Sequence, residues 1–212
     1  MKRRIKHVTV LGSGIMGSGI AAHFANIGVE VLLLDIVPFE LKEAEQKKGL
    51  TKEDKVVRNR IATESLAKLV KASPALLYKK EFADRISVGN FDDDLPKIKN
   101  TDWIIEVVVE RLDIKKSVYE KIEQFRKPGT LASSNTSGIP INMLVEGRSA
   151  DFKHYFAGTH FFNPVRYLPL LEIIPTKDTD AEIVKFYMEY GAKFLGKTTV
   201  LAKDTPAFIA NR

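Results

Sequence analysis

The sequence predicts an α/β fold with a doubly wound, mostly parallel sheet. Short apolar runs alternate with helix-compatible segments along the chain, which is typical of a parallel sheet covered by helices. The first such repeat is followed by a charged helical insertion. Strands are expected at 6–11, 29–36, 86–88, 103–109, 130–134, 155–161, 170–174 and 198–202, and helices near 15–27, 113–126 and 180–194.

The first strand, 6–11, is a β-branched run that ends at a cluster of glycines. Residues 15–27 then show the apolar spacing of a helix, which Gly28 closes. A second apolar run, 29–36, completes a β-α-β unit of ordinary length. Because a helix connects the two strands, they are expected to be parallel.

Residues 38–80 are charged and favour helix, so we expect a helical arm or hairpin that projects from the sheet. Its apolar residues recur at roughly helical spacing. The segment contains eleven Lys or Arg against six Asp or Glu, so nearly all of the formal net charge of +6 is concentrated there as +5. The same lysines could simply form a solvated helix face.

The remaining strands follow at the spacing of further α/β units. Asn163-Pro164 and Pro169 interrupt the chain between 155–161 and 170–174, which allows the second strand to return beside the first. We find no internal repeat and no low-complexity linker. Residues 1–212 are therefore expected to form one domain that includes the arm at about 38–80.

Composition narrows the class of protein. With 212 residues and 44% hydrophobic residues, the chain can bury one large core. The absence of cysteine excludes disulfides, thiolate nucleophiles and cysteine-ligated zinc, and it fits a cytoplasmic protein. No apolar run approaches the ~20 residues of a membrane span. We expect no metal, no nucleic-acid partner and no membrane segment.

The glycine cluster predicts a dinucleotide site. Gly12-Ser13-Gly14-Ile15-Met16-Gly17 matches G-x-G-x-x-G between a strand and a helix. Asp35 ends the second strand, where a carboxylate accepts hydrogen bonds from a ribose diol and repels a 2'-phosphate. The fold is thus Rossmann-like, and NAD is favoured over NADP. Alternatively, the glycines only make a turn and Asp35 caps the next helix.

Residues 131–138 run from a predicted strand into a polar cluster, Ser133-Ser134-Asn135-Thr136-Ser137-Gly138. In open parallel sheets, ligands bind beyond the carboxyl ends of the strands, so this cluster would face the cofactor cleft. These residue types are equally common in solvated turns. The pattern alone does not decide between the two.

Glu172 lies within an apolar run, 170–174, that should be a buried or half-buried strand. A carboxylate there costs several kcal/mol unless it is paired, and His160 is the natural partner. Beside a nicotinamide, the imidazole would accept a hydroxyl proton while the carboxylate orients the ring. A core histidine bonded to backbone and a glutamate at a strand edge are the alternative.

The segments GSGIMGSG, LLLDI, VVVERLDIKK, SSNTSG, GTHFFNP and KDTPAFIANR closely resemble, in order and spacing, the NAD-binding domain of the 3-hydroxyacyl-CoA dehydrogenase family. The resemblance spans almost the whole chain. It is strongest to the long bacterial fatty-acid oxidation enzymes, in which a hydratase-like region follows the dehydrogenase. It implies oxidation of L-3-hydroxyacyl-CoA to 3-oxoacyl-CoA by NAD in fatty-acid β-oxidation.

The resemblance also implies roles for individual residues. His160 would be the general base and Glu172 its partner, Ser134 would bond the substrate oxygen beside the nicotinamide, and Asn211 would contact the reacting group. Three further residues match family positions near NAD, and two match coenzyme A contacts in a reorganised segment. These are Glu110, Lys115 and Asn163 for NAD, and Ser65 and Lys71 for coenzyme A.

The family continues past the equivalent of Arg212 into a helical domain, so we expect such a domain to follow. The full-length protein should then be a homodimer and this stretch alone monomeric. We also expect Asn211 to lie at a frayed end.

Two other functions fit parts of the pattern. A different NAD-dependent hydroxyacid dehydrogenase shares the glycine loop but relies on a lysine instead of a His-Glu pair. A non-catalytic NAD-binding protein would have no need to retain His160, Glu172, Ser134 and Asn211 together.

Overall fold

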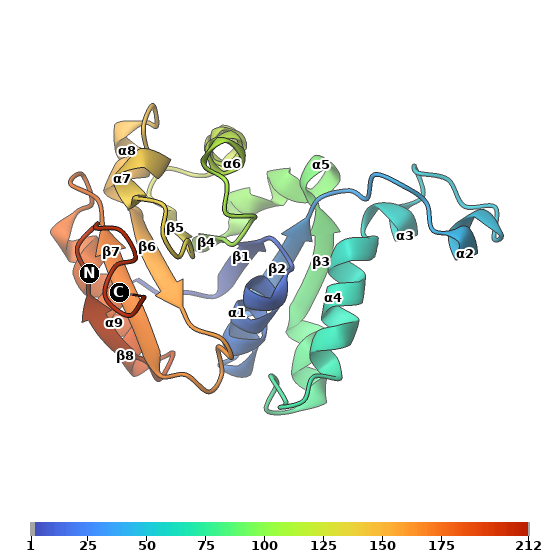
Figure 1. The fold of residues 1–212 in the computed structure, drawn as a ribbon, viewed down its shortest axis with the longest axis horizontal. Helices are drawn as coiled ribbons and strands as arrows, with labels where there is room; N and C mark the ends of the chain where they lie inside the picture. The colour runs from blue at the N-terminus through green and yellow to red at the C-terminus, as the bar shows by residue number, and fades with distance from the viewer. Residues whose placement is uncertain (1–2, 212) are drawn as a thin grey trace.

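The structure, a computed structural model, describes residues 3–211. Within this range eight strands form one sheet in the order β3-β2-β1-β4-β5-β6-β7-β8 (Figure 1). The strands are β1 (His7–Leu11), β2 (Glu30–Asp35), β3 (Ile86–Asn90), β4 (Trp103–Glu106), β5 (Leu131–Ser134), β6 (Phe156–Phe161), β7 (Leu170–Pro175) and β8 (Thr198–Leu201). The predicted strands are all present.

Neighbouring strands from β3 to β6 pair in parallel, β7 runs antiparallel to β6, and β8 is parallel to β7. The reversal at β7 follows the break that Asn163-Pro164 and Pro169 make in the chain, as predicted. The order of the parallel strands reverses at β1, where the chain crosses from the β2–β3 side to β4. This position is the usual ligand crevice of an open α/β sheet. The predicted Rossmann-like fold is confirmed.

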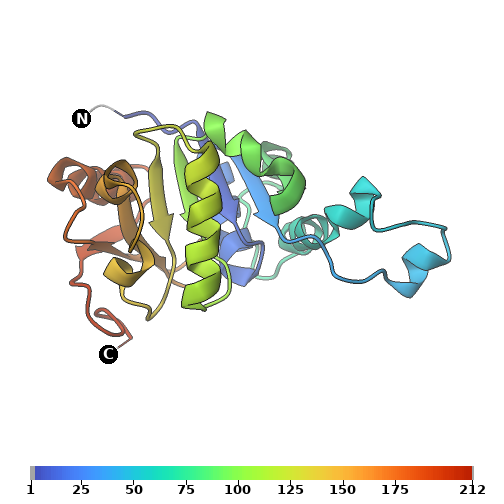
Figure 2. The same ribbon diagram turned by 90° about the horizontal axis from the view of Figure 1, so that it is seen from above.

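Helices cover both faces of the sheet (Figures 1 and 2). α1 (Ile15–Asn26), α4 (Arg60–Val70), the 3-10 helix η1 (Lys80–Arg85) and α9 (Ala181–Lys193) contribute to one core. The other core holds the 3-10 helix η2 (Leu95–Asn100), α6 (Leu112–Phe125), α7 (Ile141–Leu144) and α8 (Ala150–His154). α5 (Phe91–Asp94) joins β3 to η2, while α2 (Glu43–Gln46) and α3 (Lys55–Arg58) belong to the insertion.

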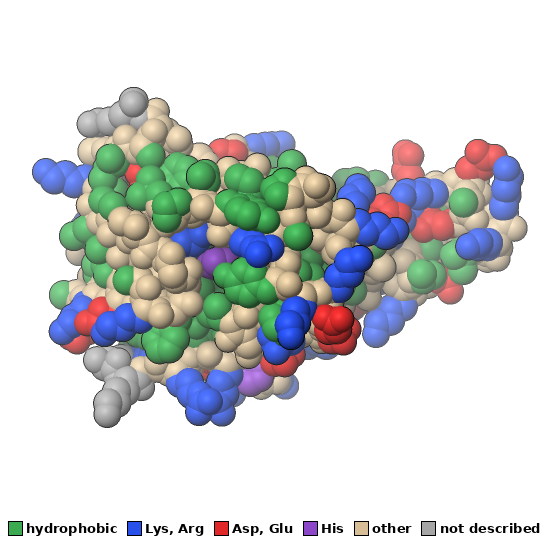
Figure 3. All heavy atoms as spheres, turned by 90° about the horizontal axis from the view of Figure 1, so that it is seen from below, with side chains coloured by type: hydrophobic (Ala, Val, Ile, Leu, Met, Phe, Trp, Pro, Cys, Tyr) green, Lys and Arg blue, Asp and Glu red, His purple; other side chains and the backbone are tan. Residues whose placement is uncertain are grey.

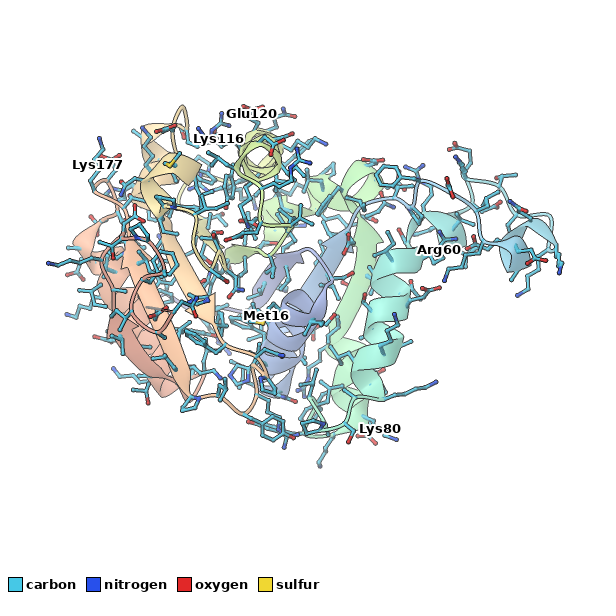
Figure 4. All side chains as sticks on the ribbon, viewed as in Figure 1. Met16, Arg60, Lys80, Lys116, Glu120 and Lys177 are labelled. Carbon is cyan, nitrogen blue, oxygen red and sulfur yellow. The ribbon has the colours of Figure 1, made fainter. Side chains whose placement is uncertain are left out.

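Part of the predicted arm does not project. α4 packs against α1, β2 and β3, and it buries Ala62 and Leu69, because its apolar residues recur on one face. The projecting part holds α2 and α3, ahead of Arg60 at the start of α4 (Figure 4). The prediction of an arm over the whole of 38–80 is therefore wrong for α4. A short helix with no buried residue, such as α2, has no apolar face to dock.

The projecting part carries both charge signs, intermixed along the face that Figure 3 shows. Its charged side chains form ion pairs: Glu45 contacts Arg60 at the start of α4, and Arg58 Nε lies 2.6 Å from Asp93 Oδ2. Because Asp93 lies outside 38–80, its pair with Arg58 offsets part of the net charge of the segment.

His23 gives the fold a testable pH dependence. Its Nε2 lies 2.8 Å from Leu195 O, and its Nδ1 is buried without a partner. Burial first, and the charge of Lys197 second, lower the pKa of His23 from 6.5 to about 4. The unfolded chain therefore binds this proton more tightly. The contribution to stability is full above the unfolded pKa and is lost as the pH falls through the folded one.

We expect His23→Gln to flatten the loss of stability in acid. In the wild type, this group accounts for a loss of roughly 2–3 kcal/mol in the free energy of unfolding between about pH 7 and about pH 4.5. Urea denaturation of both proteins at the two pH values measures the difference. Equal losses in wild type and variant would show that His23 does not titrate as the fold requires.

Candidate cofactor cleft and catalytic pair

The turn between β1 and α1 needs glycine at two positions for different reasons. Gly12 has φ +105°, and a Cβ added there would lie 2.5 Å from Val107 O. A Cβ at Gly17 would lie 1.9 Å from Gly12 O, so only glycine lets α1 approach the turn. Gly14, in contrast, has open space within 4 Å of its Cβ position. Backbone is thus exposed at the start of α1, where anions bind.

The carboxylate of Asp35, at the end of β2, is tied to this turn. Oδ2 accepts bonds from Ser13 N and Ser13 Oγ, both 2.6 Å away, and Oδ1 accepts one from Ile36 N at 2.7 Å. A carboxylate offers about four acceptor sites, so one stays available for a ligand hydroxyl. Asp35 therefore orders the turn and keeps capacity for a ribose.

A groove of about 710 Å³ opens at this point between the glycine turn and α6. Gly12, Gly14 and Asp35 line it together with mostly apolar side chains, while α6 adds the polar side chains of Asp113, Ser117 and Lys121. This volume is within the range of cofactor sites. Ile15 is 77% exposed at the helix start, while Met16 packs against the core (Figure 4). The open backbone at Gly14, the carboxylate and the groove fit a dinucleotide, and the apolar wall suits its adenine.

His160 and Glu172 are brought together on β6 and β7. The antiparallel register sets them opposite each other, and His160 Nδ1 lies 2.7 Å from Glu172 Oε2. The contact predicted from the sequence is present. Glu172 is completely buried and His160 is 4% exposed. Nδ1 makes the one hydrogen bond of the ring with residues 3–211, which leaves Nε2 available.

The other oxygen of Glu172 is held by the segment after β8. Oε1 accepts bonds from Ile209 N at 3.1 Å and Ala210 N at 2.8 Å. Phe208 is buried, and its ring centre lies 5.8 Å from that of His160. The two amides fix the carboxylate that pairs with His160, and the Phe208 ring packs near the imidazole.

Asn211 does not lie at a frayed end as we expected, because the 204–211 segment is anchored at several points. Asp204 accepts bonds from Ile141 N and Asn142 N, at 2.7 and 2.9 Å. Asn211 itself is exposed, and its Nδ2 lies 3.4 Å from Ser137 O. It therefore reaches the polar loop after β5 rather than the His160 ring.

Ser134 ends β5 and is completely buried. Its hydroxyl donates to Glu106 Oε2 at 2.6 Å and accepts from Thr136 N at 3.1 Å. In this structure the side chain holds the polar loop and offers no surface to a ligand. Glu106, at the end of β4, was not predicted from the sequence, although a carboxylate in an apolar strand was the signal that identified Glu172.

Lys115, one of the residues expected near NAD, is 1% exposed. Its Nζ lies 2.7 Å from Glu106 Oε1, 3.2 Å from Glu110 Oε2 and 3.3 Å from Val108 O. All three ammonium donors are used, so no proton is left for a bound molecule. Lys115 instead neutralises two carboxylates beneath the groove.

Glu110 keeps part of its carboxylate at the surface. Oε1 accepts bonds from Thr136 Oγ1, from Ser137 N at 2.9 Å and from Gly138 N at 3.2 Å. Burial acts to raise the pKa of Glu110, but the hydrogen bond from Thr136 and the charge of Lys115 outweigh it, so the pKa is lowered. The side chain stays 45% exposed and can meet a ligand.

The other predicted residues are Asn163, Lys71 and Ser65. Asn163 is exposed after β6, and Lys71 is exposed just after α4. Ser65 Oγ lies 3.1 Å from Ser13 Oγ, so it borders the glycine turn. Among residues 3–211, no cluster of three or more acidic or histidine side chains could hold a metal ion. In the same range, no helix has the length and apolarity that crossing a membrane requires.

Comparison with known proteins agrees with this architecture. The family model described as "3-hydroxyacyl-CoA dehydrogenase, NAD binding domain" matches residues 7–205. A probable 3-hydroxyacyl-CoA dehydrogenase of Bacillus subtilis is 56% identical over 212 residues, which is 100% of this chain and 27% of that protein. A putative fatty acid oxidation complex trifunctional enzyme of Rickettsia felis is 40% identical over 100% of this chain and 28% of its own length.

The solved structure of (S)-3-hydroxybutyryl-CoA dehydrogenase from Ralstonia eutropha superposes with a TM-score of 0.73. It is 30% identical, and the match covers 99% of this chain and 67% of that one. The chain thus spans under a third of the two curated relatives described above. Because the family model matches nearly its whole length, the chain belongs to the NAD-binding domain family of the 3-hydroxyacyl-CoA dehydrogenases.

Proposed function

We propose that this chain is the NAD-binding catalytic domain of an enzyme that oxidises L-3-hydroxyacyl-CoA to 3-oxoacyl-CoA in fatty-acid β-oxidation. The observation that carries the proposal is the buried His160–Glu172 pair, whose Nδ1–Oε2 contact leaves the imidazole Nε2 without a partner in the described range 3–211. It lies in a domain whose family binds NAD.

The geometry supports a division of labour in this reaction. His160 Nε2 accepts the proton of the substrate hydroxyl. Nδ1 keeps its own proton and donates it in a hydrogen bond to Glu172. Glu172 stabilises the resulting imidazolium while the Ile209 and Ala210 amides hold the carboxylate in place. The glycine turn, Asp35 and Glu110 would hold NAD, which would supply a hydride acceptor. General-base catalysis of this kind contributes roughly 100- to 10,000-fold to the rate.

We expect the wild type to bind NAD more tightly than NADP because the Asp35 carboxylate receives ribose hydroxyls and repels a phosphate. Asp35→Ala should weaken NAD binding roughly 10- to 100-fold, which is the size of one lost charged hydrogen bond. It should also reduce the ratio of NAD affinity to NADP affinity. Calorimetry with both cofactors measures this. Ser13→Ala, which keeps the carboxylate, is the matched control and should retain the preference. Equal affinities in the wild type would defeat the argument.

The coenzyme A moiety is proposed to bind along the basic segment 38–80, with Ser65 and Lys71 as contacts. Lys68 and Lys71 are exposed at the end of α4 and just after it. Replacing both with glutamine should raise the KM for acyl-CoA several-fold at low salt and less at high salt. Lys99→Gln with Lys127→Gln removes equal charge elsewhere and should leave KM unchanged. An effect of the same size on KM in both double variants would show that Lys68 and Lys71 are ordinary surface residues and do not contact coenzyme A.

Other expectations concern the longer protein. We propose that a helical domain follows, that the full-length protein is a cytoplasmic homodimer, and that residues 1–212 alone are monomeric. On this view the 212-residue chain binds NAD but turns over acyl-CoA poorly, because part of the acyl site lies outside it. Light scattering and an assay of this chain beside a longer natural form test these points together.

An NADH absorbance assay separates the proposed function from its alternatives. The longer natural form should oxidise 3-hydroxybutyryl-CoA and leave β-hydroxyisobutyrate unreacted, since the latter suits a lysine-based hydroxyacid dehydrogenase. The reverse preference would support that other enzyme class. Tight NAD binding without oxidation of any 3-hydroxyacyl-CoA across chain lengths would support a non-catalytic role.

A further inference from the structure

A closed ring of hydrogen bonds joins the loops that follow β4 and β5. Ser134 Oγ donates to Glu106 Oε2 at 2.6 Å and accepts from Thr136 N at 3.1 Å. Thr136 Oγ1 donates to Glu110, whose Oε2 lies 3.2 Å from Lys115 Nζ. Lys115 Nζ lies 2.7 Å from Glu106 Oε1 and closes the circuit. We call these five residues the Glu106 ring.

The ring is fully satisfied and almost wholly buried. The Glu106 carboxylate accepts four hydrogen bonds. Lys115 Nζ and Val108 N donate to Oε1, and Ser134 Oγ and the Tyr119 hydroxyl, at 2.5 Å, donate to Oε2. Burial first, and then the Glu106 charge, raise the pKa of Tyr119 well above its ordinary value, so the phenol keeps its proton and donates. Of the ring members, only Glu110 has substantial exposure. Whatever Glu106 does for a ligand must therefore pass through its neighbours.

One side of the ring sets the wall of the cofactor groove. Val108 N donates to Glu106 Oε1 at 2.8 Å, and Lys115 Nζ donates to Val108 O at 3.3 Å. Both polar backbone groups of Val108 are thus fixed. The adjoining Val107 lines the groove and touches the glycine turn, where a Cβ on Gly12 would be 2.5 Å from its carbonyl oxygen. A shift of Glu106 would move this wall.

The opposite side of the ring reaches toward the catalytic pair. Ser137 N and Gly138 N donate to Glu110 Oε1 at 2.9 and 3.2 Å, which fixes the polar loop after β5. Ser137 O is the atom that Asn211 Nδ2 approaches at 3.4 Å. The segment that ends in Asn211 also supplies the two amides on Glu172. One buried network therefore contacts both the groove and the segment that holds the pair.

We propose that Glu106 is a positioning residue that couples the cofactor groove to the loop beside His160 and Glu172, although it touches neither cofactor nor substrate. The identity of the cofactor rests on the proposed function, whereas the coupling of the two loops does not. Ring variants should loosen the polar loop and weaken cofactor binding together, because the same bonds hold both.

Glu106→Gln is a useful probe because the neighbouring donors fix the orientation of the new amide group. Lys115 Nζ and Val108 N can only donate, so the amide oxygen must stay on their side and the NH2 group must face Ser134 and Tyr119. The NH2 group then donates to the Ser134 and Tyr119 hydroxyl oxygens, so both hydroxyl protons lose their buried acceptor and the ring loses its charge-assisted bond at Ser134. Thr136→Val, a substitution of similar shape, breaks the ring at Glu110 instead. Tyr119→Phe is the control, since it removes a bond to the same carboxylate without opening the ring.

Two measurements on the 212-residue chain test the proposal: amide hydrogen exchange without cofactor and calorimetry with NAD. We expect both ring variants to lower the protection of the Ser137 and Gly138 amides roughly 10-fold or more, with the core amide of Ala132 unchanged. NAD should bind about 10-fold more weakly to both, and Tyr119→Phe should stay within about twofold of wild type.

Equal effects of Tyr119→Phe and Thr136→Val would show that any buried defect suffices and would overturn the proposal. Normal exchange and normal NAD affinity in Thr136→Val would overturn it as well, even if Glu106→Gln fails to fold. A wild type that binds no NAD would instead refute the cofactor assignment. The exchange data, collected without cofactor, would still decide whether the ring holds the loop.

Discussion

His160→Gln should lower turnover of 3-hydroxyacyl-CoA by about 100- to 10,000-fold while NAD binds normally. Glutamine keeps a polar side chain on β6 but has no basic atom to take the hydroxyl proton. The contacts proposed for NAD are the glycine turn, Asp35 and Glu110, and they do not include the His160 imidazole. His154→Gln is the matched control, because that histidine is exposed and pairs with Asp180 at 3.2 Å. A near-normal rate in His160→Gln would place the base elsewhere.

Glu172→Gln tests whether the two residues act as one unit. The amide would still accept from or donate to the imidazole, but it carries no charge to stabilise the imidazolium. The variant should slow the same step, and adding it to His160→Gln should cause little further loss, since a partner has no role once the base is gone. Fully multiplicative losses in the double variant would contradict the coupling.

Lys115→Met should lower the free energy of unfolding by about 3–5 kcal/mol, the cost of leaving a buried carboxylate unpaired. Glu106 is completely buried, and Lys115 is the only cation within ion-pair distance of it among residues 3–211. Urea denaturation at neutral pH measures the loss. Adding Glu106→Gln to Lys115→Met should recover part of the stability, because the orphaned charge is then removed.

The neighbouring Lys116→Met provides the control. Lys116 lies on the outer surface of α6 (Figure 4), with Nζ 2.7 Å from the exposed Glu146. An exposed ion pair contributes about 0–1 kcal/mol, so this variant should be nearly as stable as wild type. Equal losses for the two lysine variants would contradict the view that Glu106 depends on a buried counter-charge.

The strands were predictable because buried parallel strands are continuous apolar runs with abrupt polar ends. Short helices were not. α5 and α8 are only 4 and 5 residues long, which is too short for an apolar period, and their starts depend on local caps. Ser149 accepts from Phe152 N, and Asn90 accepts from two backbone amides. The docking of α4 was also missed, because helical spacing shows an apolar face without showing what covers it.

The His160–Glu172 contact could be predicted because a carboxylate in an apolar strand requires a partner. The same reasoning applied to Trp103-Ile104-Ile105-Glu106 would have predicted a partner for Glu106, which the structure shows to be Lys115. The anchoring of the 204–211 segment could not be predicted in this way. Ala207 and Phe208 have φ of +62° and +52°, a left-handed conformation that such residues rarely adopt, so only the tertiary contacts of Phe208 and Asp204 explain it.

The most direct test of the central claim is transfer of deuterium from C3 of labelled L-3-hydroxybutyryl-CoA to NAD by a longer natural form of this chain. The account predicts NADH that carries the label, and loss of that product in His160→Gln. Unlabelled NADH, or no oxidation of the thioester by a form that binds both ligands, would contradict it.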